Sequence, residues 1–168
     1  MKKLCGPRAG LRGFTIIELL VYSGILVVFL YVLTDIFTSV LDMQLSSQTA
    51  SAVVQDSRYI LSRFTYDIGR ANDIIVPASL GDQSSSLTIQ IGPSNYTYAA
   101  VAGDLTLTDA LTNAALNSYG TKVSNVSFRR YGNVNGKHSV RIAFTLTSTT
   151  QRANGAEVQD FQTTIGLQ

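Results

Sequence analysis

The sequence predicts an α+β fold in which one long N-terminal helix packs on an antiparallel β-sheet. Residues 14–72 contain no proline and only two glycines, Gly24 and Gly69, so one helix of about sixty residues is allowed there. After Asn72, serine, threonine, glycine and asparagine dominate, and short runs alternate apolar with polar side chains, as strands do. An amphipathic helix followed by five to seven antiparallel strands favours a helix laid across one sheet face.

Residues 1–13, MKKLCGPRAGLRG, form a basic leader with four positive charges and no acid. Positive charges beside an apolar helix hold that end in the cytoplasm, so we expect the rest of the chain to lie outside it. An ordinary secretory signal is cut after its apolar run. Here the candidate cleavage site, Gly13, precedes the run, and a glycine lets a protease approach the backbone closely. Cys5 is the one cysteine and no apolar region precedes it, which argues against a lipoprotein.

Residues 14–34 are expected to form the transmembrane part of the helix, because they are apolar nearly all round and long enough to cross a bilayer. Glu18 interrupts this run four residues after Phe14, and Asp35 marks the expected exit. A carboxylate near the bilayer centre costs about 2.5–3.5 kcal/mol on insertion scales. We therefore expect a partner for Glu18. The alternative is that Glu18 lies near the interface, where its side chain reaches water.

Residues 35–72 are expected to be the amphipathic half of the helix. The apolar residues Val53, Leu61, Phe64 and Ile68 recur at helical spacing, and Ile60 widens this stripe. The charged residues of this half are expected largely on the other side of the helix, and they are Asp56, Arg58, Arg63, Asp67 and Arg70. Arg63 and Asp67 form an i,i+4 pair there, which contributes about 0.2–0.5 kcal/mol.

Residues 73–168 are expected to form the sheet and to make one globular domain with residues 35–72. Alternation predicts strands at 87–91, 126–129, 140–146 and 161–167, and a hairpin of 96–101 with 105–107 that turns at 102–104. Residues 133–136 are expected to join two strands as a hairpin loop. Residues 109–118 are ambiguous, since their alanines and Leu111 permit a short helix.

The charge pattern bears on the partners. The net charge is +2, but four of the thirteen basic residues lie in the leader, which leaves nine against eleven acids. Residues 14–168 therefore carry −2, and we do not expect nucleic acid as a partner. One basic patch is expected from Arg129, Arg130, Tyr131, Lys137 and Arg141, as a solvated strand face or a subunit contact, with DNA contact as the alternative.

No residue pattern in the sequence indicates catalysis, so we expect neither an enzyme nor a cofactor. His138 is the one histidine, and we expect a solvated residue at a hairpin edge. The glycines are scattered at turns, with no phosphate-binding loop. Asp104 and Asp109 flank a hairpin without metal-ligand spacing, and Asp67 with Asp73 at the helix end is the one alternative, a calcium site.

The junction GFTIIELLVYSGILVVFLYVLT resembles the N-terminal signature of type IV pilins, type II secretion pseudopilins and competence pilins. The resemblance covers about forty residues. The order of the later elements looks most like a W-type minor pilin or a J-type pseudopilin. Where many members have a proline in the helix, this chain has Asp35, and it lacks the cysteines of the disulfide that many major pilins carry.

This resemblance implies a structural subunit of a type IV pilus, type II secretion or competence filament. A prepilin peptidase would cut between Gly13 and Phe14 and methylate the amine of Phe14, and Glu18 would pair with the Phe14 terminus of a neighbouring subunit. The implied partners are other pilins, that peptidase, an inner-membrane assembly platform and membrane lipid. The implied location is a single pass through the inner membrane, with the C-terminal domain outside the cytoplasm and later in a filament.

Three readings compete with the filament subunit. A membrane-anchored extracytoplasmic binding module would use the helix only as a stalk, and an anchored enzyme would use it in the same way. An uncleaved signal anchor with a chance Gly13–Phe14 pair is the third. Processing separates them, because a filament subunit must lose its leader and a stalk need not.

Overall fold

The computed structural model describes residues 14–134, 136–152 and 155–168. In this part of the chain there is one helix, α1, which covers Ile16–Gly69 without interruption. The chain divides into two compact units, Met1–Leu41, of which residues 14–41 are described, and Asp42–Gln168. In the first unit, every described residue from Phe14 to Leu41 is exposed except Glu18, which is half-buried.

The helix ends at Gly69, three residues before the expected end at Asn72. The reason is that the sheet takes over the backbone hydrogen bonds there: the Asn72 amide donates to the Gln90 carbonyl at 2.8 Å. The Asn72 side chain also accepts a hydrogen bond from the Gly92 amide at 2.8 Å. Asn72 therefore joins the first sheet rather than the helix.

The second unit contains two antiparallel sheets, whereas one sheet was expected. The five-stranded sheet has the order β1-β3-β4-β5-β6 and the four-stranded sheet the order β2-β7-β8-β9. The strands of the first are Asp73–Val76, Ser86–Ile91, Ser94–Val101, Asp104–Thr108 and Asn113–Ala115. Those of the second are Gln83–Ser84, Thr121–Gly132, His138–Arg152 and Gly155–Gly166.

The hairpin predicted at 96–107 is confirmed. β4 pairs with β5, and Ala102 and Gly103 between them have φ angles of 53° and 84°. Positive φ at both central residues is the requirement of a tight two-residue turn whose twist matches the strands. The Gly103 carbonyl in this turn accepts a hydrogen bond from the Val123 amide of β7 at 2.7 Å, so the two sheets are joined here.

Several other strand predictions need correction. The ambiguous segment 109–118 contains the short strand β6 and no helix among its residues. β1 and β2 were not predicted, because four and two residues are too few for alternation to show. β7, β8 and β9 extend well beyond the predicted segments, since residues outside the expected alternation also pair, such as Thr121 with Ser148 and Gln159 with Leu146.

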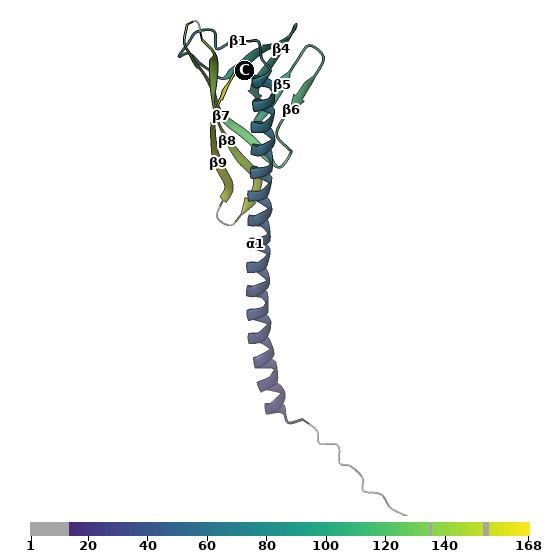
Figure 1. The fold of residues 1–168 in the computed structure, drawn as a ribbon. Helices are drawn as coiled ribbons and strands as arrows, with labels where there is room; N and C mark the ends of the chain where they lie inside the picture. The colour runs from purple at the N-terminus through teal and green to yellow at the C-terminus, as the bar shows by residue number, and fades with distance from the viewer. Residues whose placement is uncertain (1–13, 135, 153–154) are drawn as a thin grey trace, which may run out of the picture. The chain divides into compact units, whose positions relative to one another are not determined.

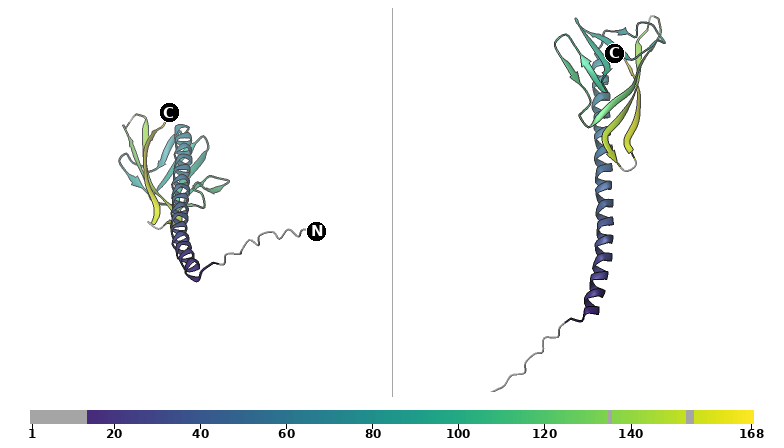
Figure 2. Two further views of the ribbon diagram at one scale, coloured as in Figure 1. Left: turned by 90° about the horizontal axis from the view of Figure 1, so that it is seen from below. Right: turned by 180° about the vertical axis from the view of Figure 1, so that it is seen from behind.

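The core of the second unit lies between α1 and the two sheets. Figure 1 shows β7, β8 and β9 on one side of the last part of α1 and β5 and β6 on the other, and Figure 2 shows the same arrangement from below and behind. Phe64 is fully buried there, with its ring centroid 4.8 Å from that of Tyr98 and 5.8 Å from that of Phe128. One side chain of α1 thus contacts both sheets.

The buried face of α1 differs in part from the predicted stripe. Val53, Ile60, Phe64 and Ile68 are buried as expected, whereas Leu61 is only half-buried. Thr49 and Ser57 are buried on the same face, and their hydroxyls donate to helix carbonyls three residues earlier.

Asp67 corrects the expectation that the charged residues lie largely on the far side of the helix. It is 1% exposed and accepts hydrogen bonds from Arg63 Nε at 2.6 Å and from the Tyr98 hydroxyl. A buried carboxylate is costly unless it is paired and hydrogen-bonded. The Arg63–Asp67 pair is therefore part of the attachment of α1 to β4, and not only an i,i+4 surface pair.

Candidate functional site

At the beginning of α1, Phe14 and Glu18 of the predicted filament role lie on one side of the helix together with Tyr22. Phe14 is 75% exposed, and its ring centroid lies 6.4 Å from that of Tyr22 in an edge-to-face arrangement. The Tyr22 hydroxyl donates to Glu18 Oε1 at 3.4 Å. The spacing i, i+4, i+8 explains why these residues meet on one side of a helix.

Thr15 gives Glu18 a local setting that the sequence reasoning missed. The Glu18 amide donates to Thr15 Oγ1 at 3.3 Å, just before the helix begins at Ile16. Thr15 and Glu18 are the first and fourth residues of a T-x-x-E pattern, which is the sequence signal of a helix N-terminus. An acid near a helix N-terminus also interacts favourably with the helix dipole. The signal was present in the sequence, where it was read only as a family motif.

The predicted leader and the Gly13 side of the predicted cleavage bond lie outside the described residues. Phe14, on the other side of that bond, is described and precedes the helix by two residues.

The N-terminal part of α1 is long and apolar enough to cross a membrane, and none of its most apolar 18-residue window is buried. A shallow hollow of about 450 Å³ opens on this helix beside Gly24 and is lined otherwise by Ile25, Val28, Phe29 and Val32. A methyl group built on Gly24 meets no atom within 4 Å. Within the described first unit, nothing covers these side chains.

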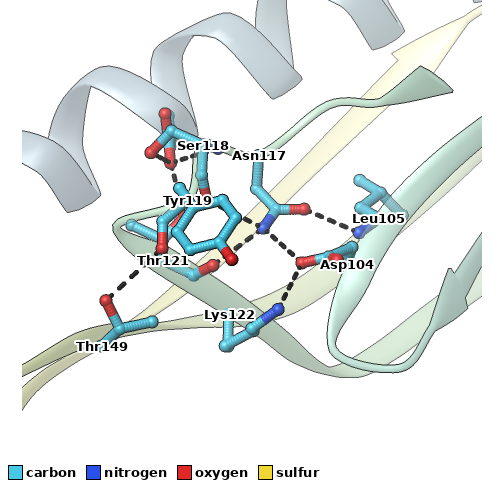
Figure 3. A network of polar contacts seen from close by, with 9 residues as sticks. Asp104, Leu105, Asn117, Ser118, Tyr119, Thr121, Lys122 and Thr149 are labelled. Carbon is cyan, nitrogen blue, oxygen red and sulfur yellow. Dashed lines mark hydrogen bonds and ion pairs between the residues drawn. The ribbon is translucent and has the colours of Figure 1, made fainter.

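A polar network in the second unit attaches α1 to the segment between β6 and β7 (Figure 3). One oxygen of Asp56 accepts hydrogen bonds from the Ser118 amide at 2.9 Å, the Ser118 hydroxyl at 2.7 Å and the Thr121 hydroxyl. Asp56 was expected on the solvated side of the helix, and this set of bonds corrects that expectation.

Asn117 continues this network towards the β4–β5 hairpin (Figure 3). Its amide oxygen accepts from the Leu105 amide at 2.8 Å, and its amide nitrogen donates to Asp104 at 3.0 Å and to the Thr121 carbonyl at 2.8 Å. Lys122 pairs with Asp104 at 2.9 Å. The hydrogen bonds from Lys122 and then from Asn117 lower the pKa of Asp104 below its usual value.

This network also walls a hollow of about 410 Å³, at whose rim the Tyr119 side chain is fully exposed. The polar groups of Asp104, Asn117 and Lys122 are engaged with one another, and no nucleophile there is hydrogen-bonded to a histidine. These bonds fasten the segment between β6 and β7 to the β4–β5 hairpin.

The predicted basic patch is divided by the structure. Arg129, Tyr131 and Arg141 point to the outer face of the four-stranded sheet, whereas Arg130 lies on the inner face and is 7% exposed. Neighbouring residues of a strand point to opposite faces, so Arg129 and Arg130 cannot both belong to one patch.

Arg130 holds the segment that contains β1 and the turn after it. Its Nη1 donates to the carbonyls of Ile74 at 2.6 Å and Ala78 at 3.0 Å, and its Nη2 lies 3.2 Å from Asp73. Its Nη2 also lies 2.8 Å from His138 Nδ1. Because arginine only donates, His138 Nδ1 accepts here. His138 is therefore half-buried and bonded, where a solvated residue was expected.

The two aspartates of the alternative calcium site bond to separate partners. Asp67 bonds to Arg63 and Tyr98, and Asp73 pairs with Arg130. Within residues 14–134, 136–152 and 155–168, no group of three or more potential ligands from His, Cys, Asp and Glu is placed to hold a metal ion.

The chain was also compared with known proteins. No protein-family model, no curated protein and no solved structure matches it.

Proposed function

We propose that this chain is a minor pilin or pseudopilin, a structural subunit of a type IV pilus, type II secretion or competence filament. The observation that carries the proposal is the start of α1. Phe14 precedes an apolar helix, Glu18 follows it by four residues, and the other described residues up to Leu41 are exposed. A helix this apolar needs a partner outside its own chain, and in a filament that partner is lipid before assembly and neighbouring helices after it.

In this function the chain is itself modified by a separate enzyme. A prepilin peptidase hydrolyses the Gly13–Phe14 bond, and the freed Phe14 amine is methylated, which keeps its charge and adds apolar surface. Glu18 of an incoming subunit then neutralises this ammonium within the bilayer. A buried ion pair offsets its desolvation only when both partners are present, so the pair would set the axial step between helices.

The four basic residues of the leader support a single pass with residues 42–168 outside the cytoplasm. The partners in this proposal are other pilins, the peptidase, an inner-membrane assembly platform and lipid.

The first experiment tests the cleavage. N-terminal mass spectrometry of membrane and sheared-filament fractions should give a chain that begins at N-methylated Phe14. A Gly13→Ser variant should retain its leader, whereas the matched Gly10→Ser variant should be cut normally, because only Gly13 borders the bond. Assembled material that begins at Met1 would contradict the proposal.

The second experiment tests Glu18. Glu18→Gln should be inserted and cleaved as the native chain is, but its share in sheared filaments should fall, because the Phe14 ammonium of a neighbour loses its counter-charge. The control is Asp35→Asn, the same change at the other acid of the N-terminal part of α1. Equal incorporation of both variants would remove the role assigned to Glu18.

The second candidate is a membrane-anchored extracytoplasmic binding module with the helix as a stalk. It is favoured by the contacts of Glu18, which already accepts the Tyr22 hydroxyl and borders the Thr15 cap without a second chain. Under this candidate the leader is retained and no sheared fraction contains the protein, so the same mass spectrometry separates the two functions.

A further inference from the structure

The outer face of the four-stranded sheet carries one row of residues from all four strands. The register places Gln83 of β2 opposite Arg129 of β7, Arg129 opposite Arg141 of β8, and Arg141 opposite Thr164 of β9. All four residues are exposed. Two guanidinium groups therefore project from directly opposed positions at the middle of this row.

Two like charges at directly opposed positions destabilise a sheet, because their Cβ atoms are about 4.5–5.5 Å apart. Neither Arg129 nor Arg141 belongs to any ion pair among the described residues. Asp160 lies on the same face, but it is opposite Thr145, four residues along β8 from Arg141, or about 13 Å. The pair thus lacks the counter-charge that would relieve it.

Arg129 is held in place by the turn before β2 and by its neighbour on β7. Its Nε donates to the Gly81 carbonyl at 3.0 Å, and its guanidinium carbon lies 5.5 Å from the centroid of the Tyr131 ring. The Gly81 amide in turn donates to the Arg130 carbonyl at 2.8 Å. Arg129 therefore presents its two Nη groups with its stem already fixed, which lowers the entropy lost when a ligand binds.

A hollow of about 210 Å³ lies over this row. Its lining includes Gln83, Ser127, Arg129, Tyr131, Arg141 and Gln162. The lining therefore offers two positive charges together with neutral groups that can donate hydrogen bonds, and it contains no carboxylate.

We propose that this hollow is a binding site for a phosphate group, held between the guanidinium groups of Arg129 and Arg141. Guanidinium forks match the oxygens of phosphate and form charge-assisted hydrogen bonds with them. A phosphate dianion neutralises both arginines at once, whereas a single carboxylate leaves one positive charge. The amides of Gln83 and Gln162 and the hydroxyl of Ser127 are the remaining donors.

The site goes beyond the proposed filament function and does not depend on it. The row lies on β2, β7, β8 and β9, all within residues 42–168. A chain that proved to be an uncleaved membrane stalk would carry the same site.

The test uses the full chain in micelles of a neutral detergent at low ionic strength. Inorganic phosphate is titrated by calorimetry, with chloride at equal ionic strength as the reference. Native protein should bind one phosphate saturably. Arg129→Gln and Arg141→Gln should each weaken binding about ten- to hundred-fold, since each removes a charged hydrogen-bond donor. Arg58→Gln is the matched control, because Arg58 is exposed on α1 and forms no ion pair among the described residues.

A second readout is the melting temperature without phosphate. Arg141→Gln should raise it, because it removes the repulsion across β7 and β8, and Arg58→Gln should not. At equal concentration, phosphate should raise the melting temperature of the native chain more than that of Arg141→Gln. A phosphate response that is equal in Arg141→Gln and native protein would overturn the site.

Two further arms distinguish the source of the phosphate. In the first arm, a short thymidine oligonucleotide binds more tightly than inorganic phosphate, and its binding is weakened by both Arg129→Gln and Arg141→Gln. This result supports the site and makes a nucleic-acid strand the source of the phosphate. Binding of the ion alone supports the site with a small phosphate ligand. Two results would overturn the assignment to phosphate. One is that the protein binds a carboxylated polysaccharide but does not respond to phosphate. The other is that the protein self-associates, that Arg141→Gln abolishes this self-association, and that phosphate again has no effect.

Discussion

The two parts of α1, before and after Leu41, carry the same kinds of apolar side chains in different surroundings. Phe37 in the first part is 63% exposed, whereas Phe64 in the second is fully buried among strands of both sheets. The second part also buries polar groups, each with a named partner, such as Asp67 with Arg63 and Tyr98. The difference teaches that the second part has its partner within the chain, whereas the apolar side chains of the first part are not covered by any described residue of their own unit.

The largest expected effect comes from Phe64→Ala, which should lower the free energy of unfolding by about 3–5 kcal/mol because it leaves a cavity between α1 and both sheets. Chemical denaturation of the full chain in micelles, followed by near-ultraviolet circular dichroism, measures it. Phe37→Ala is the same substitution on the same helix and should cost less than about 0.5 kcal/mol. Equal losses would contradict the division of α1 into two parts.

Tyr98→Phe should cost about 1–3 kcal/mol, because it removes one of the hydrogen bonds that satisfy the buried Asp67 carboxylate. The matched control is Tyr66→Phe, whose hydroxyl accepts from Arg70 at 2.6 Å on the exposed side of α1 and should matter little. The same denaturation experiment compares them. If the two variants lose equal stability, Asp67 does not attach α1 to β4 as argued.

Alkaline pH should act on the second part of α1 and its sheets and leave the first part unaffected. Burial, and then the hydrogen bond to Asp67, raise the pKa of Tyr98 above its usual value of 10.0. Folding therefore keeps this phenol protonated, so its contribution to stability is complete below pH 10 and is lost as the pH rises above it. Stability measured from pH 8 to 11 should fall more steeply in the native chain than in Tyr98→Phe, while micelle-bound helix persists.

The smallest expected effect concerns acid pH and Asp104, whose pKa is lowered by Lys122 and Asn117. A carboxylate with a lowered pKa contributes stability above its unfolded value of 3.8, and this is lost as the pH falls through the folded value. Native protein should therefore be slightly more stable than Asp104→Asn at pH 7, with the difference vanishing near pH 3. Asp42→Asn is the matched control, because Asp42 is exposed and has no ion pair among the described residues.

Periodicity was enough to predict the helix and most of its buried stripe. A face that repeats every three or four residues from Val53 to Ile68 leaves Val53, Phe64 and Ile68 few other places to lie. The β4–β5 hairpin was predictable for a similar reason, because Ala102 and Gly103 lie between two short runs that both read as strands. The apolar first part of α1 was equally plain, since a membrane-length run needs no tertiary partner to be recognised.

Charged and polar side chains were placed wrongly where their partners lie far along the chain. Asp56 bonds to Ser118 and Thr121, and Asp67 bonds to Tyr98. Local spacing shows an acid among charged neighbours and predicts a solvated face, whereas a partner more than thirty residues away is brought close only by folding. The same reason explains Arg130, which sequence proximity assigned to a patch with Arg129.

The sequence by itself determined the long helix, the apolar N-terminal run and the hairpins, because these depend on neighbours three or four residues apart in a helix and two apart in a strand. The tertiary structure alone decided that the strands form two sheets, that Asp67 is buried, and that Arg129 and Arg141 stand opposite each other without an acid. These depend on strand register and sheet packing, which join residues distant in sequence, and no local pattern records such a pairing.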